Sequence, residues 1–497
     1  MDIDAPSIRE QLEACADLLE AIEKNRALLA DAPKELRDRL LRAAGLISLP
    51  SHRDLRKLRK EEARRRKQNR REQDERALDA SGIRKARTAA IFATPSGDAP
   101  RELQPPPAAD ESQELHTPRG CYICKKNFTK VHAFYDSMCQ ECGDFNWSKR
   151  QQSADLSGRV ALVTGARVKI GYQAAIKLLR AGAHVVVVSR FPGDAAQRYC
   201  AEDDFEQWAA RLQIHGLDLR HTPSVEAFCT QLLKRLPRLD FILNNACQTV
   251  RRPAGFYAHL MDAERSLTKL PEAATALIQS GAPQQSGPSA LVQGQLGGGS
   301  AELSQLPLLA DDIGRDLSIF PEGQLDADLQ QRDLRKVNSW RLLLHEVPSV
   351  ELLEVHLVNA VAPFILNARL KPLMTRFPSS DKHIVNVSAM EGQFYRTFKT
   401  ARHPHTNMAK AGLNMLTRTS APDYVRDGIH MNSVDTGWVT DEDPAHHAER
   451  KVREHHFHPP LDIVDGAARI CAPIFDGFTS GEHVWGRFLK DYRSVDW

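Results

Sequence analysis

The chain has 497 residues, of which 42% are hydrophobic and 26% are charged, and its formal net charge is +3. This composition is ordinary for a soluble protein, and the length allows one large domain with smaller parts. No apolar run in the sequence approaches the roughly 20 residues of a membrane span, so we expect no association with a membrane.

The N-terminal region, residues 1–93, is predicted to be helical and charged. Its first residues, MDIDAPSIREQLEA, are acidic and resemble neither a secretory signal peptide nor an Arg-rich transit peptide, so we expect a cytoplasmic, reducing location. Between about residues 6 and 45, apolar residues recur at helical spacing and predict two short helices that are broken near Pro33.

Residues 53–76 are dominated by charge, and Arg and Lys outnumber Asp and Glu there by about two to one. One interpretation is a patch that binds nucleic acid or directs nuclear import. The other is a solvated helix supported by ion pairs four residues apart, such as Glu61 with Arg65. Because no aromatic residues are interleaved that could stack on bases, we favour the solvated helix and expect no nucleic-acid partner.

A small cysteine-rich module is predicted at residues 120–150, after a Pro- and Ala-rich linker at residues 94–119. Its cysteines form two pairs, Cys121/Cys124 and Cys139/Cys142, and this spacing indicates four thiolate ligands for a structural Zn²⁺ ion. Because a module of this size has little hydrophobic core, we expect the metal to supply its folding energy. A thioredoxin-like redox pair is disfavoured, because no βαβ pattern surrounds the cysteines.

Other residues of the module have roles that the spacing leaves open. His132 is an alternative metal ligand in place of one cysteine, or else a surface or supporting residue. Aromatic residues crowd the module, and we expect them to pack it against the next domain. They are Phe128, Phe134, Tyr135, Phe145 and Trp147.

Residues 159–190 have the pattern of a βαβ unit. An apolar run at 160–163 predicts a buried parallel strand, a helix follows, and residues 185–188 predict a second buried strand. The turn before the helix carries Gly165 and Gly171, and such a turn places backbone N–H groups and a helix N-terminus against a pyrophosphate. The usual fingerprint has three glycines, whereas this turn has two.

The alternation of strands and helices continues along the chain. A polar helix is predicted at about residues 201–211, a further helix at 225–236 and a strand at 239–246. Repeated units in this order predict an α/β fold with a doubly wound parallel sheet.

From about residue 156 to the last residue, 497, the chain resembles the short-chain dehydrogenase/reductase family, which has a Rossmann fold. Short motifs occur in the family's order. They are the turn TGARVKIG with Lys169 in the place of the middle glycine, Asp218, the run Asn244-Asn245-Ala246-Cys247, a helix segment with Asn359, a strand that ends at Ser388, a segment with Lys410, and the turn Ser433-Val-Asp-Thr436-Gly437 with Thr440.

The resemblance implies roles for these residues. Ser388 would hold the substrate oxygen, Lys410 would grip the nicotinamide ribose and lower the pKa of the proton donor, and Asn359 would hold a relay water. Asp218 would contact the adenine ring, and the turn with Thr436, Gly437 and Thr440 would touch the nicotinamide amide. The residues that we expect to bind the cofactor, from the resemblance or from their charge, are Gly165, Arg167, Lys169, Ile170, Gly171, Ser189, Arg190, Asp218, Leu219, Asn245, Ala246, Lys410, Thr436, Gly437 and Thr440.

The chain departs from the family at the proton donor. The position of the family's catalytic tyrosine holds Thr406, whose hydroxyl is far less acidic than a phenol. Tyr395 is our first candidate for a substitute phenol, placed on a loop. His403 and His405 are alternatives, because imidazole titrates in the right range. The further alternative is a site that does not catalyse.

The connection at about residues 250–345 is far longer than the family's usual one. Its Gly-, Gln- and Ser-rich part, residues 280–300, is predicted to be disordered. Its later part, residues 333–344, predicts a helix that acts either as a lid or as part of a passive surface insertion.

The end of the second predicted strand favours NADP over NAD. Ser189 and Arg190 stand where an acidic residue would bind the 2′-hydroxyl group of NAD, and Arg167 and Lys169 lie in the adjacent turn. Three cations without a carboxylate favour a dianionic phosphate, unless Arg190 points to solvent.

We therefore expect a cytoplasmic, NADP-dependent oxidoreductase with a zinc module before its Rossmann domain. It would transfer a hydride between the nicotinamide and a carbonyl or hydroxyl group of a small-molecule substrate. The alternative is a catalytically inactive nucleotide-binding scaffold that binds partners through the zinc module and the charged helix. The family often pairs its later helices into dimers, so a homo-oligomer is a further expectation.

Overall fold

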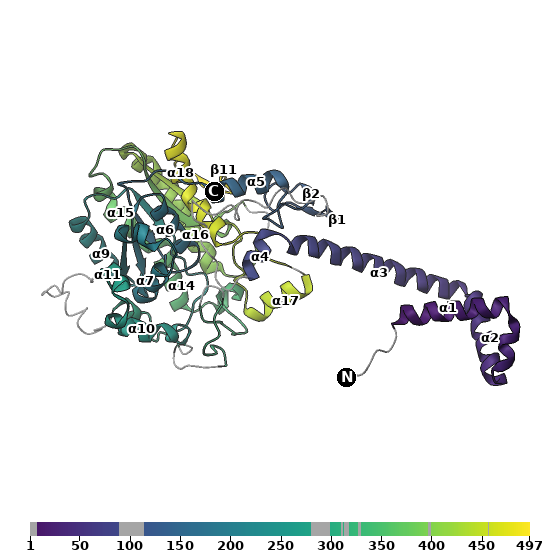
Figure 1. Cartoon of the computed structure of the whole chain (residues 1–497). Helices are drawn as coiled ribbons and strands as arrows, with labels where there is room; N and C mark the ends of the chain where they lie inside the picture. Colours follow the sequence, from purple (N-terminus) through teal and green to yellow (C-terminus); the bar gives the residue numbers. More distant parts are fainter. Residues whose placement is uncertain are drawn as a thin grey trace. The chain divides into compact units, whose positions relative to one another are not determined.

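The structure is a computed structural model that describes residues 7–88, 114–279, 299–309, 312, 318–326, 330–395, 399–455 and 457–497. It divides into two units, Met1–Asp74 and Glu75–Trp497. Figure 1 labels the helices and strands along the chain.

The first unit consists of helices, and α1 (Ile8–Lys24) and α2 (Lys34–Ser48) bury none of their side chains. The 3-10 helix η1 (Arg26–Asp31) joins them, and Pro33 stands at the start of α2, which confirms two helices broken near this proline.

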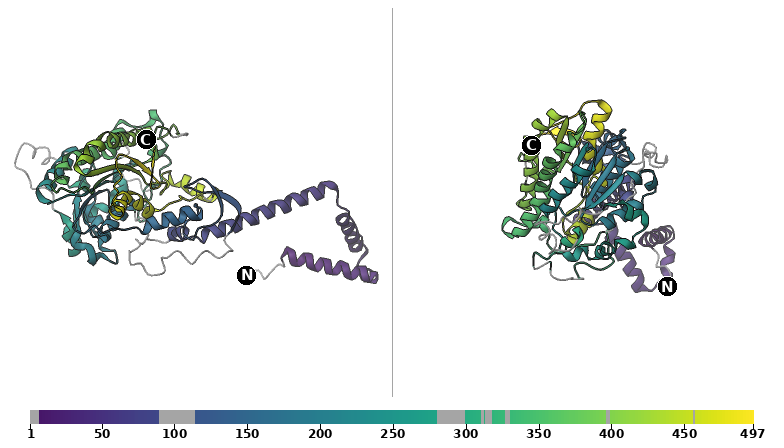
Figure 2. Two further views of the ribbon diagram at one scale, coloured as in Figure 1. Left: turned by 90° about the horizontal axis from the view of Figure 1, so that it is seen from above. Right: turned by 90° about the vertical axis from the view of Figure 1, so that its left-hand side faces the viewer.

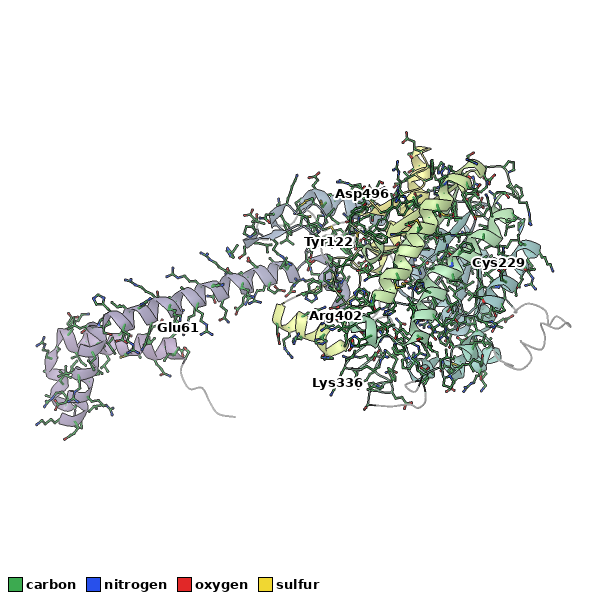
Figure 3. The ribbon with its side chains drawn as sticks, turned by 180° about the vertical axis from the view of Figure 1, so that it is seen from behind. Glu61, Tyr122, Cys229, Lys336, Arg402 and Asp496 are labelled. Carbon is green, nitrogen blue, oxygen red and sulfur yellow. The ribbon has the colours of Figure 1, made fainter. Side chains whose placement is uncertain are left out.

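The charged stretch forms one continuous helix, α3 (His52–Asp79), as predicted. We had expected Glu61, labelled in Figure 3, to pair with Arg65. Among the described residues it pairs with Arg64 instead, at 3.6 Å. Residues three and four apart are both neighbours on a helix surface, so the observed pair supports the helix in the same way.

The second unit is organised around a nine-stranded sheet with the order β11-β10-β9-β8-β6-β3-β4-β5-β7. All neighbouring strands run parallel except β10 and β11, which are antiparallel. The strand order reverses between β3 and β6, so the predicted doubly wound sheet is confirmed. The strands are β3 (Val160–Thr164), β4 (His184–Ser189), β5 (Leu212–Gly216), β6 (Phe241–Asn244), β7 (Ile278–Gln279), β8 (Lys382–Ser388), β9 (Ile429–Asp435), β10 (Phe488–Lys490) and β11 (Arg493–Val495).

Helices cover both faces of this sheet, because successive residues of a buried strand point to opposite sides. On β3, Ala161 and Val163 pack in one hydrophobic cluster with α6 and α18, whereas Val160 and Leu162 pack in another with α9 and α15. The right-hand view of Figure 2 shows the two helical layers. The main helices are α6 (Lys169–Arg180), α7 (Pro192–Cys200), α9 (Thr222–Arg235), α14 (Ser349–His356), α15 (Ala362–Met374), α16 (Pro404–Tyr424), α17 (Ala445–His455) and α18 (Ile463–Ser480).

One helical segment bears on the expectation that the chain does not associate with a membrane. The continuous helical segment Ser349–Met374 has the length and, at a mean hydropathy of 1.5, the apolar character that would allow it to cross a membrane. It packs within the second unit, where Leu366 and Leu370 are fully buried in the hydrophobic cluster on one face of the sheet.

The cysteine module belongs to the second unit and is built from β1 (Glu114–Gly120), β2 (Asn127–Lys130) and α5 (Gln140–Gln151). β1 therefore begins inside the stretch that we had predicted as linker. Leu78 at the end of α3 and Ile83 of α4 (Gly82–Thr88) are buried in the core of the module. Phe128, Phe134 and Tyr135 share this core with Val439 and Leu461 of the Rossmann domain, so the aromatic residues do pack the two parts together.

Two predicted helices differ in the structure. The polar helix expected at 201–211 is replaced by α7 (Pro192–Cys200), the single turn α8 (Phe205–Trp208) and η3 (Ala209–Arg211), because Pro192 starts a helix earlier. The helix expected at 333–344 is absent among the described residues. Asn338 accepts a hydrogen bond from the N–H of Trp340, which favours the short η7 (Ser339–Arg341) over a longer helix.

The rest of the insertion forms short elements around a hydrophobic cluster of its own. Phe256, Tyr257 and Phe320 pack there against Phe191 from the end of β4. The prediction for residues 280–300 lies almost wholly outside the described residues. The elements are η4 (Ala254–Leu260), α10 (Met261–Arg265), η5 (Leu267–Lys269), α11 (Glu272–Leu277), α13 (Ser300–Leu303) and η8 (Leu344–Glu346).

Three histidines meet at the amino-terminal ends of β8 and β9. Nε2 of His383 lies 2.9 Å from Nδ1 of His483, and Nε2 of His430 lies 2.8 Å from the carbonyl oxygen of Ser380. Burial foremost, with the neighbouring His430 and His483, holds the pKa of His383 well below its ordinary value.

We expect the free energy of unfolding to fall as the pH drops below about 6.5, the ordinary pKa of histidine. The folded chain keeps His383 neutral while the unfolded chain binds a proton there, so each pH unit below that value costs about 1 kcal/mol. In urea unfolding at about pH 7.5 and about pH 5.5, His383→Gln should reduce this loss. The control variant is His345→Gln, at an exposed position, which should leave the pH dependence of the unfolding free energy unchanged. An equal pH dependence in wild type and His383→Gln would contradict the assignment.

Candidate functional site

A cavity of about 550 Å³ opens at the carboxyl ends of the central parallel strands. Residues that follow β3, β4, β5 and β6 line it, which is where doubly wound sheets bind ligands. Lys410, Thr436 and Gly437 are not part of the lining. The expected cofactor-binding residues that do line the cavity are Gly165, Arg167, Lys169, Ile170, Gly171, Ser189, Arg190, Asp218, Leu219, Asn245, Ala246 and Thr440.

The glycine turn after β3 packs tightly against the end of β6. Nδ2 of Asn245 donates to the carbonyl oxygens of Thr164 and Gly165, at 3.0 and 3.1 Å. A Cβ atom on Gly171 would lie 2.2 Å from the same Nδ2 atom, and Gly165 has a φ of +65°. Both glycines are therefore required for this close approach.

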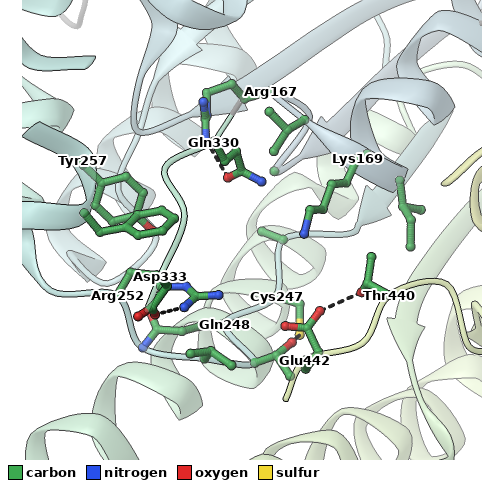
Figure 4. Close-up of a pocket in the computed structure, with 18 of the residues that line it drawn as sticks. Arg167, Lys169, Cys247, Gln248, Arg252, Tyr257, Gln330, Asp333, Thr440 and Glu442 are labelled. Atoms are coloured by element: carbon green, nitrogen blue, oxygen red, sulfur yellow. Dashed lines mark hydrogen bonds and ion pairs between the residues drawn. The ribbon is translucent and has the colours of Figure 1, made fainter. Parts of the chain in front are cut away.

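Lys169 replaces the family's middle glycine and adopts a glycine-like backbone conformation with a φ of +57°. It is the first residue of α6, so its ammonium group adds to the positive end of the helix dipole. Figure 4 shows its side chain pointing into the cavity. The turn thus offers a full positive charge to an anion.

Arg190 lies at the end of β4, at one corner of the cavity. Its guanidinium donates to the hydroxyl of Tyr257 at 2.7 Å and lies 4.6 Å from the centre of that ring. In the part of the chain that the structure describes, no carboxylate forms an ion pair with Arg190. Arg167 lies nearby but pairs with Asp194 at 2.6 Å. Arg190 is therefore the cation at this corner with spare capacity for an anion.

The positive charge of this corner affects the pKa of the phenol of Tyr257. Burial acts to raise its pKa, but the net direction is downward. The lowering comes foremost from Arg190 and also from Arg252 and Arg167. Tyr257 stands beside the β4 end of the cleft, whereas Ser388 ends β8, so its phenol is not placed as a proton donor near the serine.

The insertion supplies one wall of the cavity. Figure 4 shows Arg252 paired with Asp333, and Arg167 bonded to Gln330 at 3.1 Å. These insertion residues and Tyr257 were not found from the sequence, since no motif marks them and only the fold brings them to the cleft. The placement agrees with an insertion that covers the site.

Three predicted catalytic residues are buried together, outside the cavity lining. Within the described ranges of the chain, the hydroxyl of Ser388 has no hydrogen-bond partner, and Nζ of Lys410 donates to the carbonyl oxygen of Val387 at 2.7 Å. Asn359 lies in the π-helical turn η9 (Leu357–Val361), where Oδ1 accepts from the N–H of Gln248 at 2.8 Å. α16, which carries Lys410, packs against β8 and η9.

The candidate proton donors lie in different surroundings. Tyr395 follows the short η10 (Met390–Gly392), and its side chain is 83% exposed. Thr406 and His405 are buried on α16, and Nε2 of His405 lies 3.5 Å from Glu351. His403 caps α16 and stacks on Trp340 with ring centres 3.9 Å apart. The structure therefore does not bring Tyr395 to the cavity.

A segment of the insertion, residues 338–342, runs between the loop after β9 and the start of α16. Nδ2 of Asn338 donates to the carbonyl oxygen of Glu442 at 2.9 Å. The N–H of His403 donates to the carbonyl oxygen of Leu342 at 2.8 Å. Ser339 accepts a hydrogen bond from the N–H of Arg251 at 2.8 Å. The segment thus ties three parts of the site together.

Asp218 is held by an ion pair within the cavity lining. Arg220 contacts its carboxylate at 2.7 Å and also pairs with Glu354 at 2.8 Å. Burial acts to raise the pKa of Asp218, but the hydrogen bond and charge of Arg220 lower it. The carboxylate therefore remains ionised and fixed in place.

The four cysteines of the module form a compact cluster. The sulfur atoms of Cys121, Cys124, Cys139 and Cys142 all lie within 4.8 Å of one another. Burial acts against ionisation of Cys121, but hydrogen bonds from backbone N–H groups, that of Cys139 foremost, lower its pKa to about 7. Four sulfur atoms at this mutual distance fit a tetrahedral metal ion.

His132 does not belong to this cluster of ligands. It is buried, and its Nδ1 atom accepts hydrogen bonds from the N–H groups of Phe134 and Tyr135, at 3.0 and 3.1 Å. Gly143 of α5 packs on its ring, where a Cβ atom would come within 2.5 Å. The imidazole thus supports the fold of the module.

Comparison with known proteins identifies the family. Residues 159–266 match a family model described as short chain dehydrogenase, and residues 341–459 match one described as Enoyl-(Acyl carrier protein) reductase. A dehydrogenase/reductase SDR family member 13 of Bos taurus is 40% identical over 108 residues, which cover 20% of this chain and 27% of that protein. The chain belongs to the short-chain dehydrogenase/reductase family. By family it is an oxidoreductase of the short-chain dehydrogenase type, and the resemblance in the sequence is confirmed.

A longer match extends over most of the chain. The uncharacterized protein R665 of Acanthamoeba polyphaga mimivirus is 32% identical over 374 residues, which cover 72% of this chain and 71% of the viral protein. Among solved structures, the Pseudomonas aeruginosa RhlG/NADP active-site complex is 18% identical and aligns with a TM-score of 0.42. That alignment covers 69% of this chain and 96% of the Pseudomonas chain.

Proposed function

We propose that this chain binds NADP and transfers a hydride between the nicotinamide and a carbonyl or hydroxyl group of a small-molecule substrate. The observation that carries the choice of NADP is Arg190, which faces the cavity and has no carboxylate partner in the described part of the chain. Ser189 before it offers no carboxylate that would repel a 2′-phosphate or bind a 2′-hydroxyl group, so NAD is the weaker candidate.

The donors in the cleft fit such a nucleotide. The turn at Gly165 and Gly171, with Lys169, would take the pyrophosphate at the start of α6. Arg190 would take the 2′-phosphate, and Asp218 would lie beside the adenine. The bound nicotinamide supplies the hydride chemistry, and the protein positions it.

The substrate side of the reaction falls to buried groups on β8 and α16. Ser388 would hold the substrate oxygen with its free hydroxyl, and Lys410 would grip the nicotinamide ribose. Asn359 would hold a relay water. The proton donor is one of Tyr395, His403 and His405, because the hydroxyl of Thr406 is too weak an acid.

The alternative is a nucleotide-binding scaffold without catalysis. It is favoured by Thr406 in the place of the catalytic tyrosine and by Ser388 and Lys410, which lie outside the cavity lining. Such a scaffold would bind the nucleotide with the same turn and the same Arg190, so binding alone does not separate the two functions and turnover does.

We also propose a cytoplasmic homo-oligomer. Apolar side chains that are more than half exposed gather on the outer helices of the Rossmann domain, and burial against a second copy would remove them from water. They are Leu353 on α14, Phe364 on α15, and Met408 and Met415 on α16.

We infer that the four cysteines of the module hold one Zn²⁺ ion. The mutual distances within their sulfur cluster support this.

The cofactor prediction concerns Arg190. NADPH should bind more tightly than NADH, and Arg190→Ala should weaken NADPH binding by about tenfold or more while NADH changes little, because a charge-assisted contact to the 2′-phosphate is lost. Fluorescence titration at one fixed salt concentration measures both affinities. Arg235→Ala, on the exposed end of α9, is the matched control. Equal affinity of the wild type for both nucleotides would refute the proposal.

The catalytic prediction is tested with NADPH and a panel of aldehydes and ketones. Ser388→Ala should lower kcat by roughly 10²–10³, the effect of losing one donor to the reacting oxygen.

If Tyr395 is the proton donor, Tyr395→Phe should lower kcat by about 10²–10⁴, whereas Thr406→Ala should do much less. A large loss in His405→Gln with none in Tyr395→Phe would assign the imidazole instead. NADPH binding without any turnover would favour the scaffold.

The zinc prediction is a content of about one Zn per chain in the purified full-length protein. Cys139→Ser should release the metal and lower the melting temperature, since the metal supplies folding energy to the module. Cys15→Ser, an exposed cysteine on α1, is the control and should keep the metal. Full zinc retention in Cys139→Ser would count against the assignment.

A further inference from the structure

The turn after β9, residues 436–440, contacts both the cavity and the cysteine module, and Val439 belongs to both. Val439 and Thr440 line the cavity beside Ile170 of the glycine turn. Gly437 rests on the cysteine module and on Leu461. The turn is therefore a wall shared by the proposed nucleotide site and the module.

Tyr122 makes the direct contact between the module and this turn. It stands between Cys121 and Cys124, and its hydroxyl oxygen accepts a hydrogen bond from the N–H of Trp438 at 3.0 Å. A Cβ atom on Gly437 would lie only 3.2 Å from that oxygen. Gly437 has a φ of +76°, so the backbone there takes a conformation that few residues adopt. The tyrosine thus fits the backbone of the turn closely.

A second contact of Tyr122 reaches the start of the turn. The ammonium group of Lys490 lies 5.9 Å from the centre of its ring and donates to Asp435 at 2.9 Å. Asp435 is the last residue of β9, directly before the turn. The same tyrosine therefore touches the N–H of Trp438 and the cation that holds the end of the strand.

The module is itself anchored to α18 by buried polar contacts, so the position of Tyr122 is fixed. The hydroxyl of Tyr135 donates to Asp465 at 2.6 Å, and Arg150 pairs with Asp462 at 2.7 Å, all four side chains being buried. Within the module, the N–H of Tyr122 donates to the carbonyl oxygen of Ser137 at 2.8 Å. These contacts hold Tyr122 in one place relative to α18.

We propose that Tyr122 is a positioning residue, which holds the 436–440 turn against the nicotinamide end of the cavity. The inference rests on the proposed binding of NADP. It makes the cysteine module part of the cofactor site, because the knuckle that carries two of the sulfur ligands also carries the contact to the turn.

The test uses two ligands that reach different ends of the cleft. NADPH carries the nicotinamide, whereas 2′,5′-ADP carries only the adenosine end with its phosphates. In the full-length protein, Tyr122→Phe removes the acceptor for the N–H of Trp438 and should weaken NADPH binding by about three- to tenfold. The affinity for 2′,5′-ADP and the zinc content should stay unchanged.

Tyr135→Phe is the matched control, since it removes another phenol hydroxyl from the same module but touches Asp465 instead of the turn. It should lower the melting temperature without changing the ratio of the two dissociation constants. An equal loss of both ligands in Tyr122→Phe, no loss at all, or a selective loss of NADPH in Tyr135→Phe would overturn the inference. If the wild type binds neither ligand, the proposed function itself fails.

Discussion

The close approach of the β3–α6 turn to the end of β6 is the constraint on which the cleft depends. The amide of Asn245 donates to two carbonyl oxygens of the turn, and neither Gly165 nor Gly171 leaves room for a side chain. This contact fixes the start of α6 and so aims its N–H groups into the cavity. Lys169 fits the same turn only because it adopts a positive φ, and it adds a charge where the family has a glycine.

A buried network of charges joins the cysteine module to α18. Arg150 contacts both Asp462 and Asp465, and Arg469 contacts Asn146 of α5 and Asp491. Taking such charges out of water is costly, so their value lies in a unique orientation more than in net stability. The network and the aromatic core fix the orientation of the module on the Rossmann domain, and this orientation brings the module beside the turn after β9.

The insertion after β6 adds a second layer to the site. It closes the β4 corner through Tyr257 and the hydrophobic cluster around Phe191, and it reaches α16 through residues 338–342. The catalytic groups expected from the family lie among β8, η9 and α16, where the ammonium group of Lys410 donates to the carbonyl oxygen of Val387 and Asn359 accepts from Gln248. The departure from the family pattern is Thr406 in the place of the catalytic tyrosine, and Tyr395, the candidate substitute, is exposed.

The sequence by itself determined the local elements and the chemistry of the motifs. Apolar runs such as 160–163 specify buried strands, glycines at 165 and 171 specify the turn, and paired cysteines specify the cluster, because each depends on neighbouring residues alone. The tertiary structure decided what depends on distant contacts. Helix formation at 333–344 lost to hydrogen bonds made by Asn338, and Tyr395 remained at the surface. Tyr257 and Tyr122 became neighbours of the cleft only because packing, which no local pattern records, carried them there.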